Sequence, residues 1–135
     1  MPGIFFPAPF CGEAADPNEL REFQKLAVQV SVAAGKTIFS EGELADNVFG
    51  LSRGFVRLYK LLPYGGRRQI LGFALPGDFL GMPINDRHCL SADAIGEVTL
   101  SRFSRIKLAN FVLSSPNVLR LLMEFAARQL EMAQD

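Results

Sequence analysis

The chain has 135 residues, enough for one domain with its own hydrophobic core, and its 14 Lys and Arg residues balance its 14 Asp and Glu residues. A neutral chain lacks the excess positive charge that drives nonspecific nucleic-acid binding, and a 49% hydrophobic composition excludes intrinsic disorder. Two Cys are too few for a disulfide framework or a four-thiolate metal site, and no apolar stretch is long enough to span a bilayer. We therefore expect a globular, cytoplasmic domain.

The N-terminal part is expected to be irregular and then helical. Residues 1–15 contain three Pro and two Gly, which favours an irregular lead-in. Asp16-Pro17-Asn18-Glu19 combines an N-cap, a first-turn Pro and a Glu that returns the capping bond, and it predicts a helix over about 17–27. Val28, Val30 and Val32 then alternate with polar residues, which predicts a half-buried strand.

From residue 37 to about residue 104 the pattern is that of short strands between turns. The predicted strands are Thr37–Ser40, Asn47–Ser52, Phe55–Leu62, Gln69–Leu75 and two stretches within 89–103. Glycines at the predicted turns, Gly42, Gly54, Gly66 and Gly77, are 12, 12 and 11 residues apart, a spacing typical of antiparallel sandwiches and barrels. No helical period occurs between these strands, which argues against a β/α alternation.

The C-terminal part is predicted to be helical. Ser104 caps a helix that ends near Ser114, and Ser115-Pro116 opens a second helix that continues to the end of the chain. The second helix has one narrow polar stripe, so its apolar arc is wider than a helix needs to pack on its own domain. This favours a homodimer seam, and the alternatives are a more deeply buried helix or one covered by the N-terminal residues. The predicted seam consists of Leu119, Leu122, Met123, Ala126, Leu130 and Ala133.

Three runs of sequence, 34–43, 48–59 and 65–81, resemble the signatures of the cyclic-nucleotide-binding fold. The third run is most similar to the Fnr/FixK branch of the Crp/Fnr family of bacterial transcription regulators. The resemblance covers roughly residues 20–135. It implies a mainly β fold with flanking helices, namely an antiparallel double-stranded β-helix (jelly roll) with a long C-terminal helix. We accordingly predict a lead-in over 1–15, the β-roll with short flanking helices over 16–114 and a dimerisation helix over 115–135.

The resemblance also implies an effector and dimerisation region. In the family a helix-turn-helix DNA-binding domain normally follows this region, and the whole regulator contacts RNA polymerase. This chain ends at Asp135 without such a domain or a basic recognition helix, so we expect it not to bind DNA specifically by itself. Either a fragment of a regulator or a natural stand-alone sensor is compatible with the sequence.

The resemblance places a ligand cassette at Gly77, Asp78, Phe79, Leu80, Gly81, Arg87 and His88. In the family a Glu holds the ribose hydroxyl, and an Arg followed by Ser or Thr binds the cyclic phosphate. Here Asp78 is one methylene shorter than Glu, His88 follows Arg87, and Asp86 competes for the charge of Arg87. Ala133-Gln134 stands where cAMP-responsive members present Thr-Ser to the adenine. We therefore predict that Gly77 and Gly81 are turn glycines of the roll, that Arg87 is a solvated or ion-paired surface residue, and that cAMP gives no response. The alternatives are a degenerate or differently selective nucleotide pocket and a pocket for another small ligand.

Other chemistry has less support in the sequence. Cys89 would be a redox-reactive thiol if Arg87 favours its thiolate, and is otherwise a small buried hydrophobic residue. With only Cys11 and Cys89, the four-thiolate iron–sulfur cluster of Fnr-type sensors is excluded, and the single residue His88 argues against haem ligation and against a cupin-like metalloenzyme. We find no catalytic motif and predict no cofactor and no enzymatic activity.

Five basic residues lie in or near one predicted hairpin: Arg53, Arg57, Lys60, Arg67 and Arg68. They form either a solvated face or a patch for a partner such as RNA polymerase. Two functions remain for the chain: the effector and dimerisation domain of a FixK-like Crp/Fnr regulator, or a stand-alone β-roll that binds a cyclic nucleotide or another small molecule. The two differ in whether the reading frame continues past Asp135 into a helix-turn-helix domain.

Overall fold

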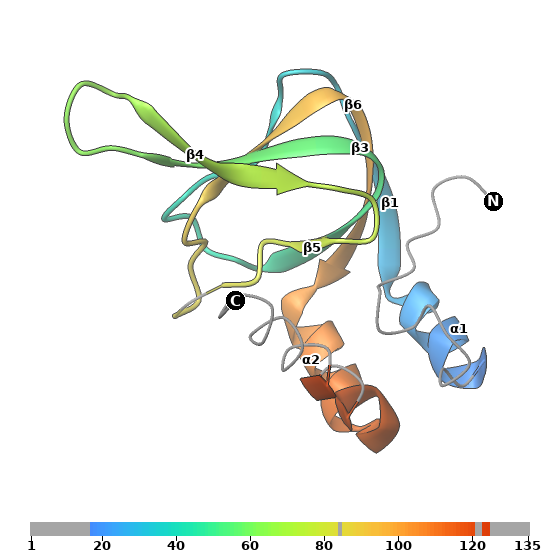
Figure 1. Ribbon diagram of the computed structural model, residues 1–135. Coiled ribbons are helices and arrows are strands. Elements are labelled where there is room, and N and C mark those ends of the chain that lie inside the picture. Colours follow the sequence, from blue (N-terminus) through green and yellow to red (C-terminus); the bar gives the residue numbers. More distant parts are fainter. Residues whose placement is uncertain (1–16, 84, 121–122, 125–135) are drawn as a thin grey trace.

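The computed structural model describes residues 17–83, 85–120 and 123–124. Its elements follow the chain from helix to strands to helix (Figure 1), with α1 (Pro17–Lys25), β1 (Ala27–Val32), β2 (Thr37–Phe39), β3 (Asn47–Leu61), β4 (Arg68–Ala74), β5 (Phe79–Leu80), β6 (Ser91–Ser104) and α2 (Arg105–Leu113). Residues 116–120 and 123–124 are also helical.

All strand pairs in the sheet are antiparallel, and the sheet is organised around β3 and β6. These strands have 15 and 14 residues, whereas most strands have about five or six, so each pairs with different neighbours at its two ends. Strand β6 pairs with β2 near its start and with β1 near its end, and β3 pairs with β5 and then with β4. The sheet consequently curls into a roll (Figure 1).

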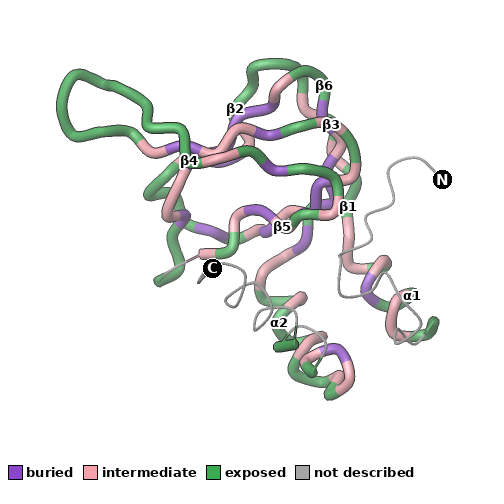
Figure 2. The backbone as a smooth tube through the Cα atoms, viewed as in Figure 1, coloured by how far each residue is buried: buried purple, intermediate pink, exposed green. Residues whose placement is uncertain are grey.

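The interior of the roll is apolar. Leu51 and Val56 of β3, Val98 and Leu100 of β6 and Leu80 of β5 are buried together in the main core cluster. The alternation of strand side chains between two faces places these residues inside and their neighbours outside. In contrast, the β3–β4 turn extends away from the roll, and residues 61–71 are all exposed (Figure 2).

A second cluster attaches the helices to one end of the roll. The ring of Phe23 in α1 stacks on Phe103 of β6 with centroids 4.8 Å apart, and Phe79 of β5 meets Phe23 edge-on at 6.3 Å. Leu108 and Phe111 of α2 pack against the same cluster. Both helices therefore lie at the same end of the sheet (Figure 1).

The mainly antiparallel β architecture with flanking helices is confirmed. The Ser104 cap is confirmed as well, because its Oγ accepts a hydrogen bond from the backbone N–H of Lys107. Two predicted strand breaks are wrong: Asn47–Ser52 and Phe55–Leu62 form the single strand β3, and the two stretches predicted within 89–103 form the single strand β6. The first helix is also shorter than predicted, since Ala27 already belongs to β1.

Gly54 explains the wrong break in β3. It has φ +93° and lies between Arg53 and Phe55, at a register shift of the β3–β6 pairing, so it bends the strand without ending it. The lead-in over 1–15 lies outside the described residues, as does most of the predicted dimerisation helix. The described part of that helix is the helical stretch 116–120 together with 123–124.

We predict that Gly54→Ala lowers the free energy of unfolding by about 1–3 kcal/mol, measured by urea denaturation. A Cβ at this position would lie 2.6 Å from the backbone oxygen of Glu97, in a conformation that side chains rarely adopt. The matched control is Gly72→Ala in β4, where a Cβ would meet nothing within 4 Å. Equal effects of the two substitutions would contradict this role of Gly54.

Candidate functional site

A pocket of about 180 Å³ lies next to β5, in the region of the predicted ligand cassette. Its wall combines β2, β3 and the 79–90 segment and is largely apolar. The lining residues are Phe39, Leu58, Phe79, Leu80, Gly81, Met82, His88, Cys89 and Leu90. Four of the predicted cassette residues, Phe79, Leu80, Gly81 and His88, are thus brought together, along with Cys89.

His88 is the polar residue buried most deeply in this wall, with 6% of its surface exposed. Its ring stacks on Phe39 with centroids 4.2 Å apart and 21° between the planes. Burial lowers the pKa of His88, against the opposing influence of Glu43 and the Gly81 backbone, so the ring is neutral at pH 7. Its Nδ1 atom is buried and has no hydrogen-bond partner among the described residues.

The backbone around His88 holds the ring in this position. The N–H of His88 donates to the carbonyl of Glu43, and the N–H of Gly42 donates to the carbonyl of His88, at 3.0 and 2.8 Å. Gly81 gives the ring room, because a Cβ there would lie 3.1 Å from His88 Cε1. The glycine therefore permits the stacking of His88 on Phe39.

Asp78 does not line the pocket. Its carboxylate accepts a hydrogen bond from the N–H of Leu75 at 2.8 Å, and the residue is exposed. Gly77 supplies the positive φ of the same turn, +101°. In this geometry Gly77 and Asp78 close the turn between β4 and β5, and the carboxylate is used by the protein's own backbone.

Arg87 also lies outside the pocket. Its Nη1 donates to the carbonyl of Gly42 at 2.7 Å, and the residue is exposed. Asp86, expected to compete for its charge, pairs instead with Arg105, with 2.7 Å between Oδ1 and Nη1. The pocket wall thus contains neither the carboxylate nor the guanidinium of the predicted cassette.

Phe79 is part of both the pocket wall and the aromatic cluster around Phe23. Its side chain lines the pocket, and its ring also packs on Phe23 of α1 and, at 6.1 Å, on Phe103 of β6. Cys89 lines the pocket as a partly buried free thiol. The pocket therefore borders directly on the aromatic cluster that anchors the helices.

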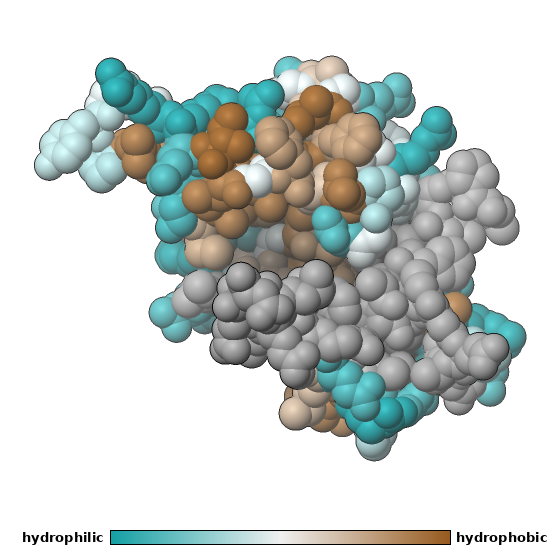
Figure 3. Space-filling view, in the orientation of Figure 1, coloured by the Kyte–Doolittle hydropathy of each residue, from teal (hydrophilic) through white to brown (hydrophobic). Residues whose placement is uncertain are grey.

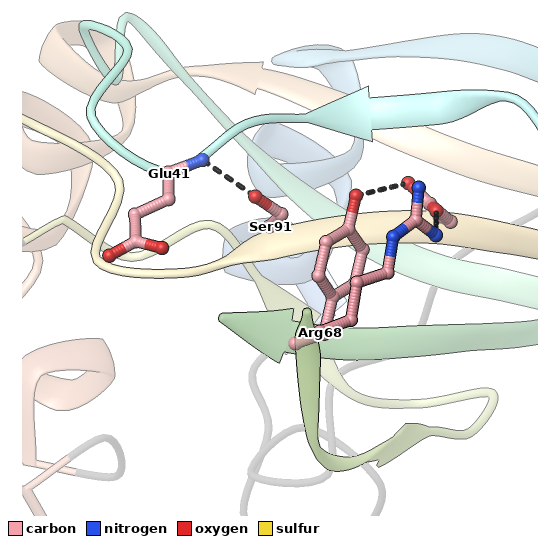
Figure 4. Close-up of polar contacts among 5 residues, drawn as sticks. Glu41, Arg68 and Ser91 are labelled. Carbon is pink, nitrogen blue, oxygen red and sulfur yellow. Dashed lines mark hydrogen bonds and ion pairs between the residues drawn. The ribbon is translucent and has the colours of Figure 1, made fainter. Parts of the chain in front are cut away.

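A polar network joins β3, β4 and β6. Arg68 donates to Asp93 at 3.1 Å and lies over the ring of Tyr59, whose hydroxyl donates to the other oxygen of Asp93 (Figure 4). Burial first, and then the bond to Asp93, raise the pKa of Tyr59. In the same figure Ser91 accepts a hydrogen bond from the N–H of Glu41.

The predicted basic patch is partly neutralised within the chain. Arg68 is paired with Asp93, and Lys60 lies 3.8 Å from Glu41. Arg53 and Arg67 are exposed. The five basic side chains therefore do not act as one uniform positive surface.

The described part of the chain exposes two apolar surfaces. One is a groove lined by Pro116, Leu119, Arg120, Met123 and Glu124, which contains two residues of the predicted dimer seam. Leu122, Ala126, Leu130 and Ala133 lie outside the described residues. The other surface gathers over β4 (Figure 3), where Ile70, Leu71 and Phe73 are each about half exposed. Contiguous apolar surface of this kind marks interaction sites.

Within the described ranges, no group of three or more His, Cys, Asp or Glu side chains is placed to hold a metal ion. No helix among these residues is long and apolar enough to cross a membrane.

Comparison with known proteins defines the class. The cyclic nucleotide-binding domain family matches residues 29–115, so the chain belongs to that family. Within it, the chain is 48% identical over 120 residues to the nitrogen fixation regulation protein FixK of Bradyrhizobium diazoefficiens, covering 89% of this chain and 50% of FixK. It is 49% identical over 125 residues to the transcriptional activatory protein AadR of Rhodopseudomonas palustris, covering 93% of this chain and 52% of AadR.

A solved structure agrees with these relatives. FixK2 from Bradyrhizobium japonicum superposes with a TM-score of 0.69 at 36% identity, covering 81% of this chain and 55% of FixK2. The predicted resemblance to FixK-like Crp/Fnr regulators is thereby confirmed. The chain spans about half the length of the curated relatives that it matches.

Much of the pocket wall was missing from the sequence-based site. Phe39, Leu58, Met82 and Leu90 carry no ligand-binding signal of their own, and they reach the pocket only through the pairing of β2, β3 and β6. The signals that pointed there were the cassette residues Phe79–Gly81 and the position of His88 where the family pattern has a hydroxyl residue.

We predict that the protein loses stability as the pH falls below about 6.5. The unfolded chain protonates its His near that pH, whereas the pKa of folded His88 is lower, so the stabilising contribution is complete above 6.5 and is lost between 6.5 and the folded value. Urea midpoints from pH 7.5 to 5 measure this loss. His88→Phe keeps an aromatic ring at this position but removes the titrating imidazole, so its urea midpoint should depend less on pH. Parallel pH profiles of the two proteins would contradict the prediction.

Proposed function

We propose that the chain is the effector and dimerisation half of a Crp/Fnr-type transcription regulator in the cytoplasm. It is non-catalytic, and DNA binding resides in a helix-turn-helix domain outside these residues. The identity to FixK and AadR over most of the chain supports this function. The exposed Arg53 and Arg67 are the candidates for a contact with RNA polymerase in the whole regulator.

We further propose that cAMP is not the signal. The observation that carries this proposal is the outward direction of both charged cassette side chains, because Asp78 bonds to Leu75 and Arg87 to Gly42. A cyclic phosphate is an anion, and burying it without a matched positive group is costly. The pocket of about 180 Å³ is also smaller than the roughly 300–1,000 Å³ of usual ligand sites.

Dimerisation through the C-terminal helix is supported by the groove at residues 116–124. Leu119 and Met123 are one helical turn apart and line it together, and Met123 is 64% exposed. An isologous helix pair would cover these side chains in both copies. A β-roll that binds a small molecule without a DNA role remains a second candidate, supported by the apolar pocket.

We expect no binding heat when the protein is titrated with cAMP or cGMP in a calorimeter. The charged side chains that would hold the nucleotide are engaged elsewhere, so any affinity should be weaker than about 1 mM. A dissociation constant in the micromolar range would overturn the proposal and assign the cassette to a nucleotide after all.

We predict that Met123→Glu raises the dimer dissociation constant at least about tenfold, measured by sedimentation equilibrium. The substitution places a charge in the apolar groove, where pairing would bury it. The matched control is Ile106→Glu on α2, a residue that is 69% exposed and lies outside the groove. A monomeric native protein, or the same effect from both substitutions, would contradict the proposed seam.

A further inference from the structure

We infer that the pocket beside β5 binds a small uncharged molecule, about one six-membered ring in size, with one hydrogen-bonding group directed at His88. The inference rests on the proposed function as an effector domain and names the class of ligand. The size of the pocket, its one buried polar atom and the lack of charged side chains among its described lining residues each limit that class.

Size is the first limit. The pocket has about 180 Å³, and an apolar cavity of about 150 Å³ in another protein is sufficient to take up benzene. Rings from Phe39 and Phe79 and aliphatic groups from Leu58, Leu80 and Leu90 supply most of the lining. Such a wall favours the flat or aliphatic faces of one ring.

Polarity is the second limit. Buried polar atoms in proteins almost always have a hydrogen-bond partner, and one without a partner requires an explanation. The Nδ1 atom of His88 is such an atom among the described residues, on a side chain that is 94% buried and lines the pocket. A ligand with a hydroxyl group satisfies Nδ1 in either tautomer, because a hydroxyl both donates and accepts.

Charge is the third limit. Among the described residues, the pocket wall contains no Lys, Arg, Asp or Glu, and the neighbouring Asp78 and Arg87 are bonded to backbone groups outside it. His88 is neutral, since burial lowers its pKa although Glu43 acts in the opposite direction. An ionised ligand would therefore be desolvated without compensation.

Three monosubstituted benzenes test these limits: phenol, toluene, which matches phenol in size, and benzoate, which carries a charge. His88 is the only His in the chain, so its ring Cε1–H gives one assignable NMR signal to follow during titration. We expect phenol to shift this signal with a dissociation constant of about 1 mM or tighter. Toluene should bind about fivefold more weakly, and benzoate more weakly still.

Cys89 gives a second readout in the native pocket. In a Cys11→Ser background, phenol should slow the alkylation of Cys89 by iodoacetamide in proportion to occupancy, because this thiol lines the pocket. The matched variant His88→Phe keeps the aromatic ring on Phe39 and removes both nitrogens, so it should bind phenol and toluene equally. Should this variant fail to fold, the three probes and the alkylation assay on the His88 protein decide the question alone.

The inference is overturned if phenol neither shifts His88 nor protects Cys89. It is overturned equally if toluene or benzoate binds as tightly as phenol. These outcomes are distinct from failure of the proposed function. That function is tested by the calorimetric titration with cAMP or cGMP and by the dimer mass from sedimentation equilibrium. A dimeric protein that does not bind phenol would contradict the proposed ligand class and leave the proposed regulator function unaffected.

Discussion

The pairing of β3 with β6 is the constraint on which the rest of the structure depends. Both strands are more than twice the usual length, and they pair along nearly their whole extent, from Asn47↔Ser104 to Tyr59↔Ser91. Every other strand adds to one of these two, so their bending sets the curvature of the roll. Gly54 permits that bend beside Glu97 at a distance that only glycine tolerates. The pocket lies beside this pair, between Phe39 of β2, Leu58 of β3 and Leu80 of β5.

The sequence predicted the fold class better than it predicted where the long strands begin and end. Turn glycines, strand patterning and the Ser104 cap were sufficient for the mainly β architecture. Gly54 was interpreted as a turn, because a glycine between two apolar runs looks the same whether the chain reverses or bulges. Only the pairing with β6 distinguishes the two cases, and that pairing joins residues about forty positions apart, beyond the reach of local patterns.

The same limit applies to the candidate site. The sequence shows which residues stand at Asp78, Arg87 and His88 and how they depart from the family pattern. The directions of these side chains could not be predicted, because those of Arg87 and His88 depend on the β-bridge between Leu44 and Arg87. Adjacent residues in extended backbone point to opposite sides, so one long-range pairing turns the guanidinium outward and the imidazole inward. A shift of one residue would exchange them.

Continuous packing joins the pocket to the predicted dimer helix. Phe79 lines the pocket and packs on Phe23, Phe23 packs on Phe111, and Phe111 contacts Val118, which precedes Leu119 in the groove. Contact alone does not establish coupling, which requires an element with two arrangements that both sites favour unequally. Within the described part of the chain, the ring of Phe79 lines the pocket and also packs on Phe23 of α1. A ligand that moves Phe79 would therefore act on the helices directly, whereas one that fills the space beside Leu58 and leaves Phe79 in place would stabilise the roll without a signal.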